Sequence, residues 1–454
     1  MHGDWIRPAP YTTPFPETVG SAMTYGLHEG PCGRLYILLP WNGVNNFGYF
    51  NVGSPIWNSL PPLPGRAAGV GSNLCYLYWQ DPPYPPISVI FCTKGNNTNE
   101  FWCYDISNNE WQRLEDIPGP VYQGSGMALA TGDIGSYYGQ LCANIYLLKG
   151  VTEPSGTNSE FYVYHFPLPI YPQGRNNWNP WERLPHFDGD HGSGADLTYR
   201  VSDNSLYAFQ GNQNSANGVI GFWKYNISTR TWTRLSDYNN PRAPGAYQGS
   251  ALGTWGVAGN EMIPQPPPMH DNIIYAFRGG GSRIFDAYSV PDDIWNYDLP
   301  DVPSWLAERI YHGSDLACGY IPFSGMCYMY AIFGEGYPNN PNYNVGAFWP
   351  GEDQPSGGQA VLSKISEQEM VRLSPNPVSE KVTFQFLVPH TSNTTVKIFD
   401  CSGKLINLIS CPVQCQEVVW DTKNAKGEMV SSGIYFYSVK MEKKVAFGKV
   451  IIQR

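Results

Sequence analysis

The stretch "YDISNNEWQRLEDIP" at residues 104–118 returns as "YNISTRTWTRLSDYN" at residues 225–239. In both copies an aromatic strand runs through a short polar turn into a second strand that carries a Trp. An apolar strand with a Gly-containing turn precedes each copy, and a Gly-Ser pair followed by small and apolar residues stands before that strand. The recurring unit therefore predicts four short antiparallel strands.

The Gly-Ser pair sets the number of units at six. The pairs lie at residues 20–21, 71–72, 124–125, 192–193, 249–250 and 313–314. One four-stranded sheet leaves both of its faces open, so neighbouring units must supply its core. Small residues on the first strand allow the sheets to converge on an axis, whereas aromatic residues on the outer strands fill the wider space between sheets. We therefore predict an all-β chain with a six-bladed β-propeller over residues 1–350.

The two ends of the repeat region complement each other. The sixth unit lacks a convincing Trp strand, whereas the chain begins with a spare one, "DWIRP", at residues 4–8. We expect residues 4–8 to pair as the outer strand of the sixth sheet, which closes the ring and leaves no sheet edge unpaired. The alternative is a disordered tail in which Trp5 occurs by chance.

The two copies quoted above resemble kelch repeats, in which a tyrosine-bearing strand, a six-residue turn and a Trp strand follow one another. The kelch double glycine is intact only in "RGGG" at residues 278–281 and is reduced elsewhere, as in "KGNN" and "QGNQ". The resemblance covers roughly residues 1–350 and implies a propeller. It does not fix a function, because one fold hosts many functions.

A second domain is indicated at the C-terminus by a change in charge. Residues 372–454 contain 11 basic and 6 acidic residues, whereas the preceding part contains 17 basic and 32 acidic ones. Alternating strands such as "KVTFQFLV" and "IYFYSVKM", separated by Gly-containing turns, predict a small β-sandwich there. Residues 351–371 begin with a Pro/Gly/Ser-rich stretch and are expected to form a linker.

Four elements of this sandwich resemble, in order, the C-terminal sorting domain of cargo of the bacterial type IX secretion system. They are "SPNP", "VKIFDCSGKLI", "WDTKNAKGEMVSSGIYFY" and the end "GKVIIQR". The resemblance implies export across the outer membrane, secretion machinery as a partner, and a location outside the cell or on its surface. The alternative is a generic β-sandwich interaction module.

Composition and absent motifs exclude several classes of function. The net charge of −10 disfavours nucleic acid and anionic membranes as partners. No apolar run approaches the ~18 residues of a membrane span, and no signal peptide is visible. Nucleotide loops, His-Glu-x-x-His and Gly-x-Ser-x-Gly motifs are absent, so we predict no catalytic residues.

The ten cysteines are compatible with disulfides in an oxidising compartment. Two hairpins that we place by their turn centres bring Cys75 opposite Cys92 and Cys318 opposite Cys327, which predicts two disulfides. Cys103 also mirrors Cys92, so Cys92 has two candidate partners. Buried free thiols are the alternative.

The segment "DGDHGSGAD" at residues 188–196 gathers oxygen ligands of the kind that calcium prefers. Its spacing does not match the twelve-residue calcium loop, and a solvated turn is the favoured interpretation. We therefore predict no cofactor, with calcium as the alternative.

A ligand site is expected where the inner strands begin, at one mouth of the propeller channel. Convergent polar groups beside aromatic rings suit a small polar ligand there. The candidate ligand-binding residues are Tyr122, Gln123, Asp190, His191, Tyr247, Gln248, Tyr311 and His312. Alternatively, these side chains bond to neighbouring loops and plug the channel.

Together these features predict an exported, non-catalytic binding protein for a glycan or a protein. One alternative is a structural subunit of an extracellular assembly, which would show self-association and a large apolar patch. The other is a polysaccharide-active enzyme, which would hold two carboxylates about 5–10 Å apart in its pocket.

Overall fold

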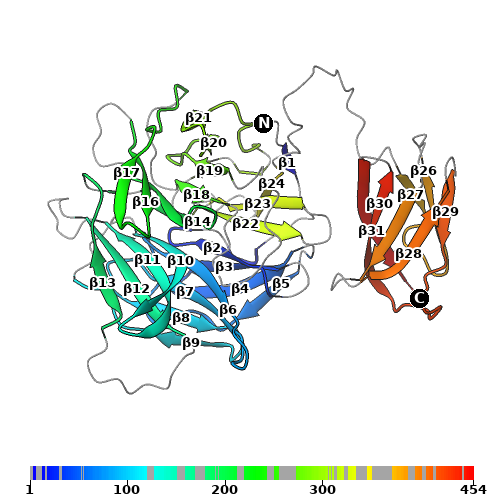
Figure 1. The fold of residues 1–454 in the computed structure, drawn as a ribbon, viewed down its shortest axis with the longest axis horizontal. Coiled ribbons are helices and arrows are strands. Elements are labelled where there is room, and N and C mark those ends of the chain that lie inside the picture. Colours follow the sequence, from blue (N-terminus) through cyan, green and yellow to red (C-terminus); the bar gives the residue numbers. More distant parts are fainter. Residues whose placement is uncertain are drawn as a thin grey trace. The chain divides into compact units, whose positions relative to one another are not determined.

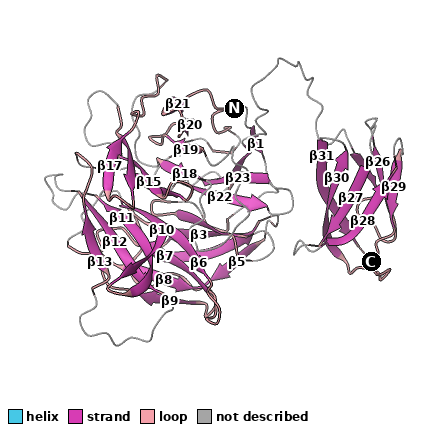
Figure 2. Ribbon diagram, in the orientation of Figure 1, coloured by secondary structure: helices cyan, strands magenta, loops and turns pink. Residues whose placement is uncertain are grey.

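The protein is described from a computed structural model. The described residues are 4–6, 13–15, 18–29, 33–52, 54, 56–119, 127–150, 159–168, 179–189, 191–192, 194–211, 219–242, 250–254, 272–304, 306–307, 309–310, 314–321, 326–333, 345–349, 371–386, 394–400, 405–412, 416–441 and 444–453. They form strands, turns and loops, and Figure 2 shows no helix among them. None of these residues therefore belongs to a helix long and apolar enough to cross a membrane.

Six four-stranded antiparallel sheets follow one another in the first compact unit, and we number them as blades 1 to 6. Blade 1 consists of β2 (Ala22–Gly26), β3 (Arg34–Trp41), β4 (Val44–Asn51) and β5 (Trp57–Leu60). Blade 2 consists of β6 (Asn73–Trp79), β7 (Ile87–Thr93), β8 (Phe101–Asp105) and β9 (Glu110–Arg113). Blade 3 consists of β10 (Met127–Tyr137), β11 (Gln140–Lys149), β12 (Glu160–Pro167) and β13 (Trp181–Leu184). Blade 4 consists of β14 (Asp196–Arg200), β15 (Ser205–Phe209), β16 (Phe222–Asn226) and β17 (Thr231–Arg234). Blade 5 consists of β18 (Ala251–Gly253), β19 (Ile273–Phe277), β20 (Phe285–Ser289) and β21 (Ile294–Asn296). Blade 6 consists of β22 (Asp315–Ile321), β23 (Met326–Ile332), β24 (Gly346–Trp349) and β1 (Asp4–Ile6).

The first strand of each blade lies nearest a common centre, as Figure 1 shows for β2, β6, β10, β14, β18 and β22. This is a six-bladed β-propeller, so the predicted fold class is confirmed. Close approach near the axis explains the small residues of these strands. A Cβ atom added at Gly253 of blade 5 would lie 2.6 Å from Sδ of Met329 in blade 6, which leaves no room for a side chain.

Blade 6 takes its outer strand from the beginning of the chain. β1 pairs antiparallel with β24, and Trp5 lies opposite Phe348. The Trp5 ring packs against Phe277, Phe285, Phe333 and Phe348, with ring centroids 5.0–6.2 Å apart. The outer Trp strand of the last blade is thus supplied by residues more than 300 positions away in the sequence.

The outer-strand Trp braces its blade against the preceding one. In blade 6 the Trp5 Nε1–H donates to the Pro300 carbonyl at 3.1 Å. The same bond to a carbonyl after the previous blade recurs for Trp111 with Pro61 (2.9 Å), Trp181 with Glu115 (3.0 Å), Trp232 with Pro185 (2.8 Å) and Trp295 with Ser236 (2.9 Å). Blade 1 differs, because Trp57 donates to Ser59 Oγ of its own strand at 3.0 Å.

The second compact unit is a β-sandwich, as predicted. Its seven strands are β25 (Val371–Ser374), β26 (Val382–Phe386), β27 (Thr394–Phe399), β28 (Leu405–Cys411), β29 (Glu417–Trp420), β30 (Gly433–Met441) and β31 (Lys444–Ile452). They form a three-stranded sheet, β25-β26-β29, and a four-stranded sheet, β28-β27-β30-β31. Residues such as Val396, Ile398 and Trp420 fill the core between the sheets. The predicted linker, residues 351–371, lies outside the described residues except for Val371.

The predicted Cys75–Cys92 disulfide is wrong. The β6–β7 register places Cys75 opposite Phe91 and Leu74 opposite Cys92, so the two thiols lie on opposite faces of the sheet. The alternative partner of Cys92 fails for the same reason, because Cys103 also lies opposite Phe91. All three residues are free, buried thiols, and burial raises their pKa values. The predicted Cys318–Cys327 disulfide involves the side chain of Cys327, which lies outside the described residues.

Candidate functional site

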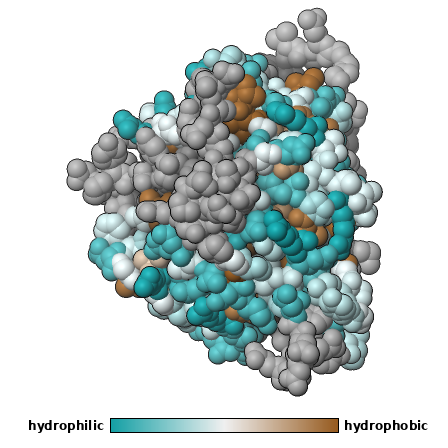
Figure 3. Space-filling view, turned by 90° about the vertical axis from the view of Figure 1, so that its left-hand side faces the viewer, coloured by the Kyte–Doolittle hydropathy of each residue, from teal (hydrophilic) through white to brown (hydrophobic). Residues whose placement is uncertain are grey.

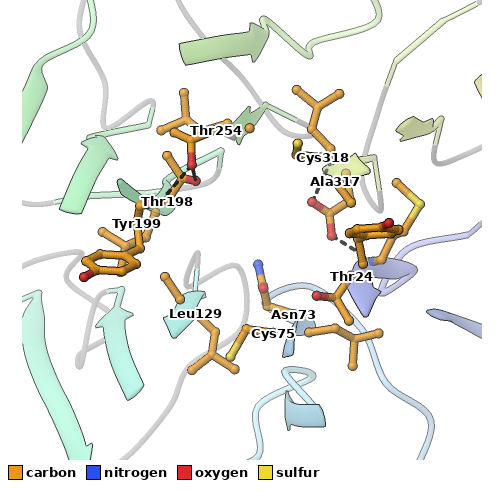
Figure 4. A pocket seen from close by; sticks show the side chains of 18 of the residues that line it. Thr24, Asn73, Cys75, Leu129, Thr198, Tyr199, Thr254, Ala317 and Cys318 are labelled. Carbon is orange, nitrogen blue, oxygen red and sulfur yellow. Dashed lines mark hydrogen bonds between the residues drawn. The ribbon is translucent and has the colours of Figure 1, made fainter. Parts of the chain in front are cut away.

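The inner strands of all six blades surround a central channel with a cavity volume of about 120 Å³. Its wall combines threonine, tyrosine and small side chains with the exposed edges of the inner strands. Figure 4 shows Thr24, Asn73, Thr198, Thr254 and Cys318 around the opening. The channel is therefore a polar concavity at the centre of the propeller.

One position of the repeat alternates in character around the channel. Blades 2, 4 and 6 carry a polar residue at the equivalent position near the start of the inner strand, whereas blades 1, 3 and 5 carry alanine. The polar residues are Asn73, Asp196 and Asp315, and the alanines are Ala22, Ala128 and Ala251. The six-fold repeat thus has a three-fold pattern of hydrogen-bonding groups at its centre.

Each aspartate of this set reaches over the alanine of the next blade and binds the backbone beyond it. Asp196 Oδ2 accepts a hydrogen bond from the Leu252 N–H of blade 5 at 2.6 Å. Asp315 Oδ2 accepts from the Met23 N–H of blade 1 at 2.8 Å, and its Oδ1 accepts from its neighbour Leu316 at 2.8 Å. The two carboxyl groups therefore tie blade 4 to blade 5 and blade 6 to blade 1.

Burial shifts the titration of both carboxyl groups upward. It raises the pKa of Asp196 to about 7, although the N–H groups of Leu252 and Leu197 act in the opposite direction. The pKa of Asp315 is also raised well above its ordinary value, first by burial and then by the charge of Asp196. Burial of both groups and the charge of Asp196 beside Asp315 therefore keep these carboxyl groups protonated at a higher pH than an ordinary aspartate.

Asn73 is the uncharged member of the set. Figure 4 shows its side chain directed into the opening. It offers both a donor and an acceptor to a molecule in the channel. On the opposite wall, the Thr198 and Thr254 hydroxyls lie 3.1 Å apart and join blade 4 to blade 5.

Of the eight predicted ligand-binding residues, the structure describes only His191. The other seven, Tyr122, Gln123, Asp190, Tyr247, Gln248, Tyr311 and His312, lie outside the described residues. The His191 side chain is fully buried. Its Nδ1 lies 2.9 Å from His186 Nε2, and its backbone N–H donates to Ser159 Oγ at 3.0 Å. His191 therefore has contacts that hold blades 3 and 4 together, and a role in ligand binding stays a prediction.

No calcium site is formed by the described part of residues 188–196. Asp196 is engaged with the backbone of blade 5 and Asp188 is exposed, while Asp190 is not described. Among the described residues of the whole chain, no three His, Cys, Asp or Glu side chains come together as a metal ion requires.

The paired role of Asp196 and Asp315 was not predicted from the sequence. A signal was present, because both aspartates precede a Leu at the first position of an inner strand. Their partners, Leu252 and Met23, belong to other blades. The interaction therefore becomes visible only when the blades are assembled.

The C-terminal residues 372–453 match the family described as the secretion system C-terminal sorting domain. The predicted sorting domain is thereby confirmed. It indicates export to the cell surface or the extracellular space and an interaction with secretion machinery. No curated protein matches the chain.

The comparison with solved structures finds matches at low identity. A fucose-specific lectin from Aleuria aurantia is 15% identical, with 76% of this chain and 100% of the lectin covered and a TM-score of 0.44. The GH93 α-L-arabinofuranosidase of Fusarium graminearum is 10% identical, with 77% and 97% covered and a TM-score of 0.45. PorZ, a surface component of the type-IX secretion system of Porphyromonas gingivalis, is 14% identical, with 96% and 51% covered and a TM-score of 0.31. These TM-scores support no functional conclusion, and the kelch resemblance stays a prediction.

Proposed function

We propose that the exported protein is a non-catalytic binding protein whose propeller holds a glycan or a protein ligand. The observation that carries the proposal is the engagement of the channel carboxyl groups. Asp196 and Asp315 accept hydrogen bonds from backbone N–H groups of neighbouring blades, so they act as braces. A general acid and base would instead need to face a bound substrate.

The proposed ligand site is the channel and its mouth, where the sequence places Tyr122, Tyr247 and His312. Asn73 and the channel threonines add hydrogen-bonding groups below that mouth. The test is an array of glycans probed with the full chain and with a variant in which Tyr122, Tyr247 and His312 are replaced by Ala. His191 is left intact because it is fully buried. Binding by the wild type that the triple variant loses supports the proposal, whereas unchanged binding places the site elsewhere.

A polysaccharide-active enzyme is the second candidate, and one observation favours it. Burial raises the pKa of Asp196 to about 7, and a carboxyl group that keeps its proton near neutral pH has the property of a general acid. Release of reducing sugar from a bound polysaccharide, lost in both Asp196→Asn and Asp315→Asn, would establish this candidate. Binding without any release would exclude it for that polysaccharide.

A structural subunit requires a large self-complementary surface. On the face in Figure 3, hydrophilic and neutral residues predominate, and the hydrophobic ones form separate small patches. The binding protein needs no such surface. The native mass by light scattering distinguishes the two, because a monomer at micromolar concentration excludes the subunit hypothesis.

A further inference from the structure

Blade 3 carries the longest inner hairpin of the propeller. β10 has 11 residues and β11 has 10, whereas the inner strands of the other blades have three to seven. A shift in register between Thr131 and Ile134 separates the part of β10 that lines the channel from the part beyond it. The outer part of the hairpin therefore extends blade 3 beyond the residues that line the channel.

The tip of this hairpin places a tyrosine where the backbone disfavours it. Tyr137 pairs with Gln140, so Tyr138 and Gly139 form a two-residue turn with φ angles of 47° and 76°. The chain makes the same turn in blade 1 with Asn42 and Gly43, at 50° and 78°. Asn-Gly is the preferred pair for this turn, and a bulky residue at its first position is an outlier.

Among the residues that the structure describes, Tyr138 is also the most exposed large hydrophobic side chain. Its relative exposure is 82%, against 43% for Tyr84 and 37% for Trp41. Its side chain interacts with Tyr137, and most of the rest of its surface meets solvent. Unfavourable backbone angles of this kind cluster at ligand-binding positions.

The base beneath Tyr138 is fixed by packing and hydrogen bonds. The Tyr137 ring meets Tyr138 edge-on at 4.4 Å and stacks on the His165 ring at 3.7 Å. His165 Nδ1 lies 2.8 Å from Asn144 Oδ1, and its Nε2 lies 3.2 Å from Glu182 Oε2. Arg230 of blade 4 then bonds to Glu182 at 2.5 Å, so two blades anchor the platform.

We propose that Tyr138 is the stacking platform of a carbohydrate subsite, separate from the channel, that binds β-linked pyranose rings with equatorial hydroxyl groups. This inference rests on the proposed binding function and assigns its ligand class. Such rings carry axial C–H bonds on both faces, and these pack on the flat face of an exposed tyrosine. The rigid base lowers the entropy lost on binding.

The surroundings of Tyr138 favour a sugar over a protein partner. An anchor residue of a protein interface sits within apolar neighbours that exclude water. Tyr138 instead has Ser136 and Gly139 beside it in the hairpin, both exposed, and Leu141 is an exposed apolar residue of the same hairpin. The partly exposed Glu182–Arg230 pair, which acts on the Tyr137 hydroxyl, supplies donors and acceptors for sugar hydroxyls.

The test uses the full chain, with cellohexaose and chitohexaose as probes in isothermal titration calorimetry. Tyr138→Asn restores the Asn-Gly turn of blade 1, so its melting temperature is expected to equal or exceed that of the wild type. Its affinity for the bound hexasaccharide should fall about tenfold or more. Tyr84→Asn, a change at another exposed tyrosine, is the matched control and should leave the affinity unchanged.

Two results would overturn the inference. Equal affinity of Tyr138→Asn and the wild type places the sugar elsewhere, and the proposed function then stands if the channel-mouth variant loses binding. Absence of binding of both hexasaccharides to the wild type also overturns it. In that case the glycan array and a protein ligand still test the proposed function independently.

Discussion

Blade 4 and blade 6 each contain four antiparallel strands in equivalent positions, but the outer strand of blade 6 comes from the N-terminal residues of the chain. In blade 4 the turn after β16 leads directly to Trp232, whose indole N–H donates to Pro185 at 2.8 Å. In blade 6 the equivalent ring is Trp5, which makes the same bond to Pro300 at 3.1 Å. The hydrogen bond from the outer-strand Trp to the preceding connection is therefore present in blade 6, although this strand is not joined in sequence to the rest of its blade.

The two blades differ in how deeply the Trp is held. Trp5 is 9% exposed and lies among four phenylalanines, whereas Trp232 is only partly buried against Phe161, Phe187 and Tyr225. β1 is not joined in sequence to the other strands of its sheet, so its pairing with β24 and the packing of Trp5 must compensate for the entropy lost when the strand is fixed. The side chain of Trp5 is therefore more deeply buried than its counterpart in blade 4.

The largest expected effect of a single substitution comes from removing that side chain. Trp5→Ala should lower the free energy of unfolding by about 3–5 kcal/mol, the range for truncating a large buried aromatic residue. Trp232→Ala should cost less, because its ring is partly exposed in the folded protein. Urea titrations of the two variants, followed by circular dichroism, give both values.

Deletion of residues 1–8 tests the same point at the level of the strand. It should reduce stability at least as much as Trp5→Ala, because the edge of β24 also loses its partner. An unchanged melting temperature after this deletion would show that blade 6 does not need β1.

A second effect, on the order of 4 kcal/mol, concerns the aspartates of these two blades. A pKa of about 7 for Asp196 in the folded protein, against an ordinary 3.8, means that folding favours the protonated form. The resulting stability is fully present below about pH 4 and is lost as the pH rises through 7. Asp196→Asn should therefore be more stable than the wild type at pH 8 and should lack this dependence, which denaturant titrations at a series of pH values would measure.

Asp315→Asn extends the test to blade 6. The pKa of Asp315 is raised partly by the charge of Asp196, so Asp196→Asn should also lower the pKa of Asp315. The control is Asn73→Ala, which removes the uncharged member of the set and should leave the pH dependence of unfolding unchanged. If the free energy of unfolding of Asp196→Asn and that of the wild type change with pH in the same way between pH 4 and 8, the assigned pKa of Asp196 is contradicted.

The propeller and the source of its closing strand were predictable because both depend on local patterns. Each unit repeats its own strands and turns, and the spare Trp strand at residues 4–8 fits the vacancy in the sixth unit; residues 4–6 form β1. Register was harder to predict. The Cys75–Cys92 prediction assumed a symmetric hairpin, and an error of one residue moves a side chain to the other face of a strand.

The candidate site was less predictable for a different reason. Asp196 was considered only as part of a possible calcium segment, because its partner, the Leu252 N–H, belongs to another blade. Tyr138 attracted no prediction, since a single tyrosine among 31 carries no signal in the sequence. Its significance comes from its φ angle and exposure, which are properties of the folded chain.

The smallest expected effect isolates the indole N–H itself. Trp5→Phe and Trp232→Phe both keep an aromatic ring but remove the donor to Pro300 or Pro185, which leaves a carbonyl of the preceding connection without its partner. A hydrogen bond of this kind contributes about 1 kcal/mol to the free energy of unfolding.

If this hydrogen bond contributes equally in blade 4 and in blade 6, Trp5→Phe and Trp232→Phe should lower the free energy of unfolding by similar amounts once the effect of the smaller ring is subtracted. Trp57→Phe is the control, because Trp57 bonds within its own strand and not to another blade. A cost for Trp5→Phe that matches Trp57→Phe but not Trp232→Phe would show that closure of blade 6 rests on ring packing alone.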